Sequence, residues 1–178
     1  ELWTRGIEMD KFSPKFNSQA LRTSIGADGK PILLFVGRLI SHKDLDDLVM
    51  ANYILKDRGY DFKTVIAGDG PMKKELKADL PDAHFTGFIY GEELSKWYAT
   101  ADVFSFPSTT ETFGNVILEA FASGTPAVGV TQGGVADIIN HAEDGLLARP
   151  KDPVDFADHL EILLKNQDFR KELGKQAR

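Results

Sequence analysis

The stretch DVFSFPSTTETFGNVILEAFASGTPAVGV, residues 102–130, decides the fold of this chain. It opens with a short run of apolar and aromatic residues that predicts a strand over 102–106, and it closes with a second such run that predicts a strand over 127–130. Between them, 115–123 carries apolar residues at helical spacing, and Gly124 and Pro126 end that helix. A strand, a helix and a second strand in this order predict one βαβ unit of a parallel sheet.

The same alternation continues on both sides of this unit. Short apolar runs predict four more strands, over 32–36, 62–67, 83–86 and 145–148. Helical spacing predicts helices over 43–58, 71–80 and 92–100, a short helix over 135–140, and a helical remainder from 153 that is interrupted near 166–168. We therefore expect a Rossmann-like, three-layer α/β/α domain with a parallel sheet of about six strands over residues 30–178, preceded by an irregular interdomain segment over 1–29.

Composition limits the class of protein. With 178 residues, of which 42% are hydrophobic, the chain is long enough for one globular domain with a substantial core. Its net charge of −6 provides no basic field, so we expect no nucleic-acid partner. The absence of cysteine excludes disulfides, and the longest aliphatic or aromatic run, Ile32 to Val36, is too short to cross a bilayer. We expect a cytoplasmic protein, and we leave open a peripheral position at the inner face of the membrane.

Residues that follow the predicted strands indicate where a ligand would bind, because parallel α/β sheets bind ligands outside the carboxyl ends of their strands. Glycine recurs after almost every strand, where backbone would have to come close to a ligand. The segments in question are Gly37-Arg38, Gly68-Asp69-Gly70-Pro71, Gly87-Phe88, Pro107-Ser-Thr-Thr-Glu111 and Thr131-Gln-Gly-Gly134.

Two carboxylates eight residues apart, Glu111 and Glu119, are the most informative pair in the chain. Glu111 lies in a Ser/Thr-rich loop, whereas Glu119 lies inside an apolar helix, where a buried carboxylate needs a partner. Between them, 112–116 supplies backbone N–H groups at a helix start, and Gly114 lets a diphosphate approach. The pair indicates a polar ligand held across the helix N-terminus, with a sugar nucleotide as the ligand. The alternative is an Asn115 N-cap with an exposed Glu119.

Arg38 and Lys43 place two cations at the end of the first strand. Arginine can clamp phosphate oxygens and lysine adds a mobile charge, although surface charges at a helix start remain the alternative. Asp44, Asp46 and Asp47 do not share a helical face, so we do not expect an Asp-x-Asp metal site there. The four histidines are scattered, and we expect no metal and no cofactor.

Taken together, these motifs resemble the C-terminal, donor-binding domain of a GT-B glycosyltransferase, in the retaining glycosyltransferase family 4. The resemblance runs from about Arg5 to the end of the chain. Three positions depart from the family pattern: Glu8 and Asp137 stand where Asp and Glu are commoner, and Asp44 stands where Gly usually follows the lysine. The matching segments are Gly6-Ile-Glu8, Phe12-Ser-Pro14, Val36-Gly-Arg-Leu39 with Lys43, Ala67-Gly-Asp-Gly-Pro71, the E-x7-E pair, Gly124-Thr-Pro126 and Gly133-Gly134.

The resemblance implies a role for each candidate residue. Arg38 and Lys43, with the Gly37 loop, would bind the donor diphosphate and stabilise the leaving group, and Glu111 would hold the sugar hydroxyls. Glu119 would bind the ribose and the backbone near Phe88 would face the base. The backbone of Phe113, Gly114, Asn115 and Val116 would surround the sugar and phosphate, and Thr112 belongs to the same donor-binding loop.

The resemblance also implies that an N-terminal acceptor domain is absent from this chain. We expect the full-length protein to move a hexose from a UDP- or GDP-sugar to a sugar or lipid-linked acceptor, and we expect the isolated chain to transfer little or no sugar. Two alternatives stay open: a nucleotide-sugar-binding module without transferase activity, and a GT-B sugar-nucleotide epimerase.

Overall fold

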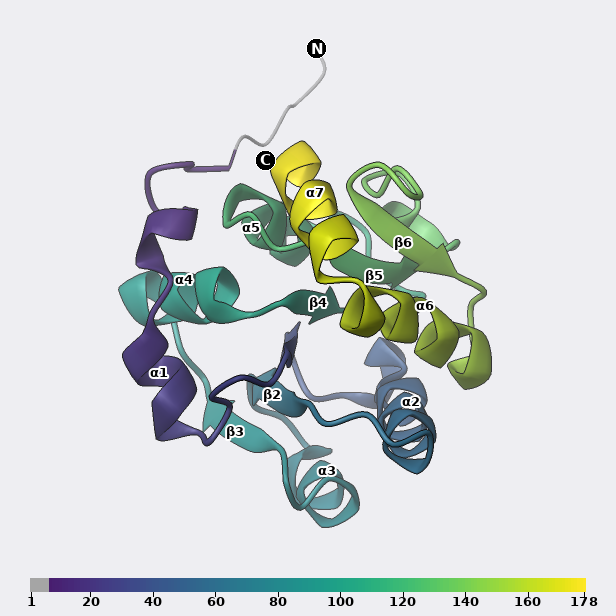
Figure 1. Ribbon diagram of the computed structural model, residues 1–178. Helices are drawn as coiled ribbons and strands as arrows, with labels where there is room; N and C mark the ends of the chain where they lie inside the picture. Colours follow the sequence, from purple (N-terminus) through teal and green to yellow (C-terminus); the bar gives the residue numbers. More distant parts are fainter. Residues whose placement is uncertain (1–6) are drawn as a thin grey trace.

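A computed structural model describes residues 7–178 and shows a six-stranded, all-parallel sheet in the order β3-β2-β1-β4-β5-β6 (Figure 1). Strands β1 and β2 pair with Leu34 opposite Val65, and β1 pairs with β4 through Leu33 opposite Val103. The chain winds outward from β1 in one direction and from β4 in the other. A topological switch point therefore lies between β1 and β4. The predicted Rossmann-like α/β architecture is confirmed.

The strands are β1 Ile32–Val36, β2 Lys63–Ala67, β3 His84–Gly87, β4 Val103–Ser105, β5 Ala127–Val130 and β6 Gly145–Ala148. The α-helices are α1 Gln19–Ser24, α2 Leu45–Asp57, α3 Lys73–Asp79, α4 Gly91–Thr100, α5 Asn115–Ala122, α6 Pro153–Lys165 and α7 Gln167–Ala177. Short 3₁₀ turns occur at η1 Pro14–Phe16, η2 Ser41–Lys43 and η3 Gly133–Val135.

The core forms because the central strands are apolar on both faces. All five residues of β1 are buried, as a strand covered by helices on both sides requires. Phe35, Phe104 and Phe106 form a stacked row across β1 and β4, with ring centroids 5.6–5.8 Å apart. Helices α2 and α6 pack together on one side of the sheet, whereas α4 contacts α5 and α1 on the other side (Figure 1).

The segment before β1 is more ordered than the sequence predicts. Helix α1 forms within it because the Ser18 hydroxyl accepts a hydrogen bond from Leu21 N–H and thereby caps the helix. The segment also binds α4, since Ser18 N–H donates to Thr100 Oγ1 (3.0 Å) and Asn17 donates to the Ala99 carbonyl (2.8 Å). Arg5 and Gly6 of the expected interdomain motif lie outside the described residues.

The short helix predicted over 135–140 is wrong. The chain makes only the 3₁₀ turn η3 and loose turns after it. The reason is a competing acceptor, because the Asp144 carboxylate accepts hydrogen bonds from both the backbone N–H (2.8 Å) and the side-chain amide (2.7 Å) of Asn140. A helix would need that backbone N–H for its own ladder.

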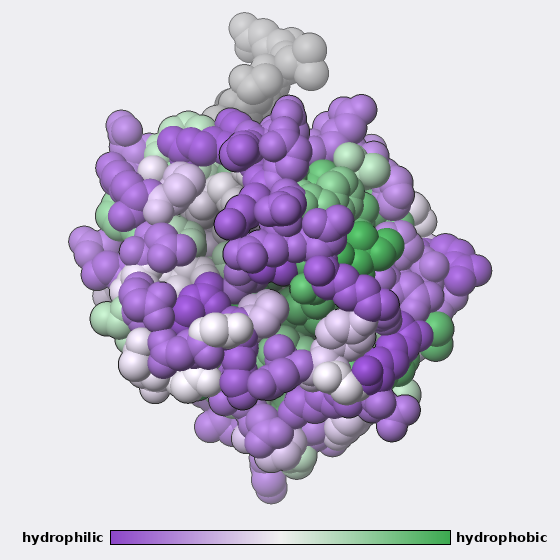
Figure 2. Space-filling model, in the orientation of Figure 1, coloured by the Kyte–Doolittle hydropathy of each residue, from purple (hydrophilic) through white to green (hydrophobic). Residues whose placement is uncertain are grey.

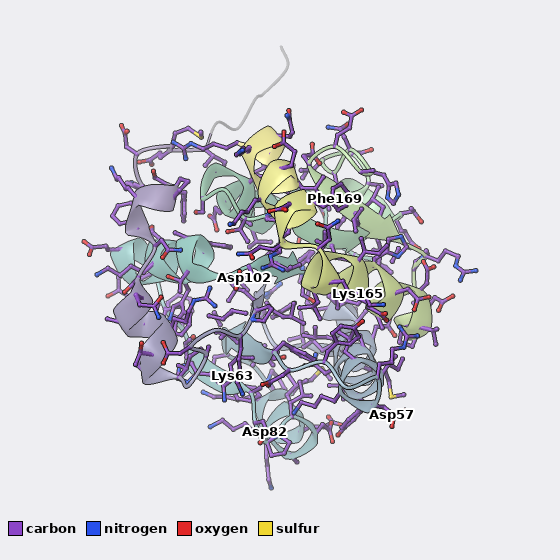
Figure 3. All side chains as sticks on the ribbon, viewed as in Figure 1. Asp57, Lys63, Asp82, Asp102, Lys165 and Phe169 are labelled. Carbon is purple, nitrogen blue, oxygen red and sulfur yellow. The ribbon has the colours of Figure 1, made fainter. Side chains whose placement is uncertain are left out.

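Asp102, immediately before β4, connects helices α1 and α7 to the sheet (Figure 3). Its carboxylate accepts hydrogen bonds from Ile32 N–H (2.8 Å), from Arg22 of α1 (2.8 Å) and from Arg170 of α7 (3.3 Å). Figure 2 shows that the surface on this side is mainly hydrophilic, with a smaller apolar area beside α7. None of the helices in residues 7–178 combines the length and apolar character that a bilayer crossing requires.

Candidate functional site

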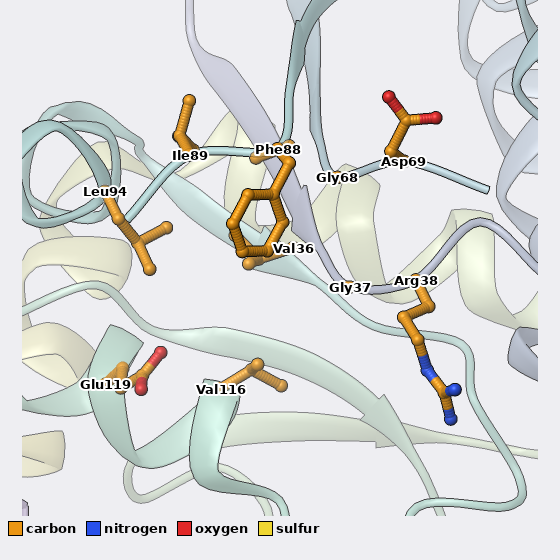
Figure 4. A pocket seen from close by; sticks show the side chains of 11 residues that line it. Val36, Gly37, Arg38, Gly68, Asp69, Phe88, Ile89, Leu94, Val116 and Glu119 are labelled. Carbon is orange, nitrogen blue, oxygen red and sulfur yellow. The ribbon is translucent and has the colours of Figure 1, made fainter. Parts of the chain in front are cut away.

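A pocket of about 260 Å³ opens at the carboxyl edge of the sheet, across the switch point between β1 and β4 (Figure 4). Gly37 and Arg38 reach it from the end of β1, and Gly68 and Phe88 reach it from the ends of β2 and β3. Val116 and Glu119 of α5 face them from the opposite side. The remaining lining residues are Val36, Ala67, Asp69, Ile89 and Leu94.

One end of the pocket combines an apolar wall with a single carboxylate. Leu94 and Val116 form part of this wall, and the ring of Phe88, 77% exposed, hangs over the opening (Figure 4). Glu119 Oε2 accepts a hydrogen bond from the hydroxyl of the fully buried Tyr98 (2.9 Å). Burial raises the pKa of Glu119 above its ordinary value, and the Tyr98 hydrogen bond only partly offsets this effect. A half-buried carboxylate of this kind can accept hydrogen bonds from ligand hydroxyl groups.

Arg38 supplies positive charge at the other end of the pocket, and the Lys43–Glu111 ion pair lies outside the pocket lining. Arg38 is exposed and makes no ion pair with any residue in the range 7–178. Lys43 Nζ lies 2.7 Å from Glu111 Oε2, and the two side chains are only 15% and 19% exposed. Burial by itself would raise the pKa of Glu111, but hydrogen bonds from Lys43 and from Gly114 N–H hold it below its ordinary value.

The N-terminus of α5 is an anion site that Glu111 occupies. Glu111 Oε1 accepts hydrogen bonds from Gly114 N–H (3.2 Å) and Phe113 N–H (3.4 Å). Gly114 caps the helix with φ +57°, and a Cβ at this position would lie 2.2 Å from Ile138 Cδ1. The left-handed backbone therefore favours glycine here, and any other residue would also force the end of the Ile138 side chain to shift. A ligand phosphate would compete with the Glu111 carboxylate for these donors.

Two glycines of the 3₁₀ turn η3, Gly133 and Gly134, contact the backbone of the Glu111 loop. Gly134 N–H donates to the Glu111 carbonyl (2.8 Å). A Cβ on Gly133 would lie 3.0 Å from the carbonyl oxygens of Thr109 and Glu111, and one on Gly134 would lie 2.6 Å from that of Thr112. The Glu111 loop thus packs directly on the backbone of Gly133 and Gly134, where a larger side chain would collide with its carbonyl groups.

The structure divides the residues predicted for the site into two groups. Gly37, Arg38, Phe88, Val116 and Glu119 line the pocket. The second group lies outside the pocket lining, on the 3₁₀ turn after β1 and at the α5 N-terminus: Lys43, Glu111, Thr112, Phe113, Gly114 and Asn115.

Some details of the site differ from the sequence reasoning or were missed by it. Asn115 is the first residue of α5 and not its N-cap. Sequence reasoning missed Ile89, Leu94 and Tyr98. The helical periodicity of α4 was the available signal, but it marks Tyr98 only as a core residue. Within residues 7–178, no three His, Asp or Glu side chains gather as metal ligands.

Fold and pocket define a three-layer α/β domain with a ligand pocket at the switch point of its sheet. The chain belongs to the group 1 glycosyltransferases, because residues 17–178 match the family model "Glycosyl transferases group 1". It is 45% identical over 159 residues to a GDP-mannose-dependent alpha-mannosyltransferase of Corynebacterium glutamicum, covering 89% of the chain and 37% of that protein. It is 38% identical over 185 residues to the sulfoquinovosyl transferase SQD2 of Arabidopsis thaliana, covering 99% and 35%. The chain thus spans little more than a third of the length of these relatives.

Solved structures share the fold. The C-terminal domain of a glycosyl transferase group 1 family protein (LpcC) from Francisella tularensis superposes with a TM-score of 0.80 at 23% identity, over 97% of this chain and 94% of that one. Anabaena HepE in complex with UDP gives a TM-score of 0.80 at 21% identity, over 93% and 49%. The domain therefore has the fold of a GT-B C-terminal domain, as predicted.

Proposed function

We propose that this chain is the donor-binding half of a retaining glycosyltransferase that moves a hexose from a UDP- or GDP-sugar to a sugar or lipid-linked acceptor. The observation that carries the proposal is the polarity of the pocket. One end is apolar with the half-buried carboxylate of Glu119, and the other end has the exposed Arg38, while the α5 N-terminus lies outside the pocket lining. A nucleotide sugar has the complementary order of base, ribose, diphosphate and sugar.

The nucleoside would occupy the apolar end. The base would lie beside the Phe88 ring and the backbone that follows β3, and Glu119 would accept hydrogen bonds from the ribose hydroxyls. Glu119 and Gly114 are five residues apart on α5, which corresponds to about 7.5 Å along the helix. That length suits a ribose at Glu119 and a diphosphate at the helix N-terminus.

The diphosphate would bind between Arg38, Lys43 and the α5 N-terminus, with the sugar beside Glu111. During transfer the bond between the anomeric carbon and the phosphate oxygen breaks, and negative charge develops on the departing diphosphate. The acceptor hydroxyl attacks the anomeric carbon on the same face and gives its proton to the oxygen of the departing diphosphate. Preorganised cations at the diphosphate lower the barrier of such a step. We propose that they do so without a divalent metal.

The relatives support a nucleotide-sugar donor without fixing the base. GDP-mannose-dependent enzymes are among the proteins to which the chain is similar, and HepE has been solved with UDP and with UDP-glucose. The acceptor would be bound by the part of the full-length protein that lies outside this chain.

Calorimetry of the chain with UDP, GDP and ADP tests the donor site. Arg38→Ala and Glu119→Ala should each weaken the nucleotide that binds best, by about tenfold, since each removes a hydrogen-bonding partner of a charged ligand. Lys74→Ala is a matched control, because Lys74 is an exposed cation on α3 outside the pocket. Unchanged binding in both pocket variants would overturn the assignment.

The full-length protein decides the reaction class. Screening it against a panel of nucleotide sugars should give free nucleoside diphosphate and a glycosylated acceptor, in excess EDTA as well as without it. A product that is an epimerised nucleotide sugar would favour the epimerase. Binding without turnover over the whole panel would favour the non-catalytic module.

A further inference from the structure

Asp44 breaks two local rules at once. It has φ 50° and ψ 40°, the left-handed conformation that an L side chain adopts at a cost, and among residues 7–178 only Ala142 and Lys151 are other non-glycine residues with positive φ. It also precedes α2 as the N-cap residue, yet its side chain makes no capping hydrogen bond. The strained backbone of Asp44 and the missing capping hydrogen bond both cost stability, so we expect other contacts of Asp44 to offset that cost.

Two other side-chain caps show the hydrogen bond that Asp44 does not make. Asp152 accepts a hydrogen bond from Asp155 N–H (3.0 Å) at the start of α6, and Asn166 accepts one from Phe169 N–H (3.0 Å) at the start of α7. Both serve their own helix, as N-cap residues usually do. The Asp44 carboxylate instead turns away from α2.

Asp44 binds the loop that carries Glu111. Its Oδ2 accepts hydrogen bonds from both the backbone N–H and the hydroxyl of Thr109, each 2.7 Å long, although the two residues are 65 positions apart. Thr109 is 7% exposed, so these are shielded, charge-assisted bonds. The neighbouring residues continue the contact, because Thr110 Oγ1 donates to the His42 carbonyl (2.6 Å).

Lys43 lies directly beside this contact and makes the ion pair with Glu111. We propose that Asp44 is a positioning residue that, through Thr109, holds the Lys43 turn against the Glu111 loop, and so keeps the Lys43 ammonium where the donor diphosphate binds. The inference rests on the proposed function for its ligand, but the placement of Lys43 can be tested without any nucleotide.

The nucleotide-free test is a carboxyl-carbon NMR titration of Glu111 in this chain. Asp44→Gly keeps the left-handed backbone at no steric cost but removes the carboxylate. If the Asp44–Thr109 hydrogen bonds position Lys43, the pKa of Glu111 in Asp44→Gly should rise at least halfway to its value in Lys43→Met. The Lys43→Met variant removes the ion pair entirely. Simple deletion of a nearby negative charge would lower the pKa of Glu111. The sign of the change in the pKa of Glu111 therefore distinguishes a positioning role of Asp44 from the effect of its charge alone.

Three further variants serve as controls for the Glu111 titration. Asp44→Asn keeps an acceptor for Thr109 and tolerates left-handed backbone, so it should restore most of the wild-type pKa of Glu111. Asp46→Ala removes the same charge from the exposed first turn of α2 and should leave that pKa unchanged. Thr109→Ala combined with Asp44→Gly should add little to Asp44→Gly alone.

Calorimetry with UDP, GDP and their nucleosides provides the second readout. Asp44→Gly should weaken the better nucleoside diphosphate about tenfold, and it should leave the affinity for the corresponding nucleoside unchanged. Unchanged diphosphate affinity together with an unmoved Glu111 titration would overturn the proposal and leave Asp44 a purely structural residue. If the wild-type chain binds neither diphosphate, the proposed function fails, and the Glu111 titration alone decides whether Asp44 positions Lys43.

Discussion

Replacing Glu111 with glutamine should strengthen the binding of a free nucleoside diphosphate while abolishing sugar transfer. The structure gives the reason. Glu111 accepts hydrogen bonds from Lys43 (2.7 Å) and from the N–H groups of Phe113 and Gly114, which are the donors that we propose bind the diphosphate. A bound diphosphate must displace the carboxylate, and Glu111→Gln removes that competitor together with its negative charge.

The size of the gain follows from the contacts that are lost. A hydrogen bond to a charged group contributes about 1.5–3 kcal/mol, and a neutral amide in the same place retains about 1 kcal/mol of it. The net relief is therefore about 0.5–2 kcal/mol, which corresponds to roughly a 2- to 30-fold lower dissociation constant. The ion pair is only 15% and 19% exposed, so solvent screening should reduce this gain little.

The assay is calorimetry of this chain with UDP and GDP, paired with turnover of the full-length protein. Glu75→Gln is the matched control, because Glu75 is exposed on α3 and its replacement removes the same charge outside the pocket lining. A loss of diphosphate affinity in Glu111→Gln as large as that in Arg38→Ala would refute the reasoning, since it would make Glu111 a direct contributor to nucleotide binding.

Four further outcomes follow from individual contacts. Tyr98→Phe removes the hydroxyl that binds Glu119 but keeps the ring, so urea denaturation should show a loss of about 1 kcal/mol and calorimetry a several-fold weaker nucleotide. Because burial raises the pKa of Glu119 above 4.5, protonation on acidification should weaken nucleotide binding at a higher pH than an ordinary glutamate would; a pH series should show this decline in the wild type and not in Glu119→Gln. Asp102→Ala removes the carboxylate partner of Arg22, Arg170 and the Ile32 N–H, although both arginines keep backbone carbonyl partners, and urea denaturation should show a loss of about 2–4 kcal/mol, with Asp102→Asn less affected. Gly68→Ala would place a Cβ 1.9 Å from the Gly37 carbonyl oxygen at φ +147°, so thermal unfolding should report a loss of about 3 kcal/mol or more.

Elements with a strong local signal could be predicted from the sequence. Strand β1 and strands β5 and β6 have the predicted bounds, because each is an apolar run that glycine or proline delimits. Helix α1 escaped prediction because six residues with none buried carry no helical periodicity. Its stability comes from contacts with α4 that lie 82 residues away in the sequence, which no local pattern contains.

The site shows the same division. The rule that ligands bind at strand ends was enough to place Gly37, Arg38 and Phe88 in one pocket with α5. The pairing of Lys43 with Glu111 joins loops 68 residues apart, and only the fold can reveal it. The hydrogen bond from the Tyr98 hydroxyl to Glu119 also depends on the fold, since the sequence indicates only that Tyr98 is a core residue.

Three residues at this edge contradict local preference, and a distant residue compensates each one. Lys43 lies at a helix start against the dipole and is paired by Glu111, Asp44 is left-handed and uncapped and is bound by Thr109, and Glu119 lies in an apolar helix and is bound by Tyr98. The first two compensations connect the loop after β1 to the loop after β4. Those loops meet only because β1 and β4 pair in parallel at the switch point. Formation of the cationic end of the site is therefore coupled to the strand pairing that joins the two halves of the sheet, and a variant that loosens β1 from β4 should lose the Lys43–Glu111 ion pair.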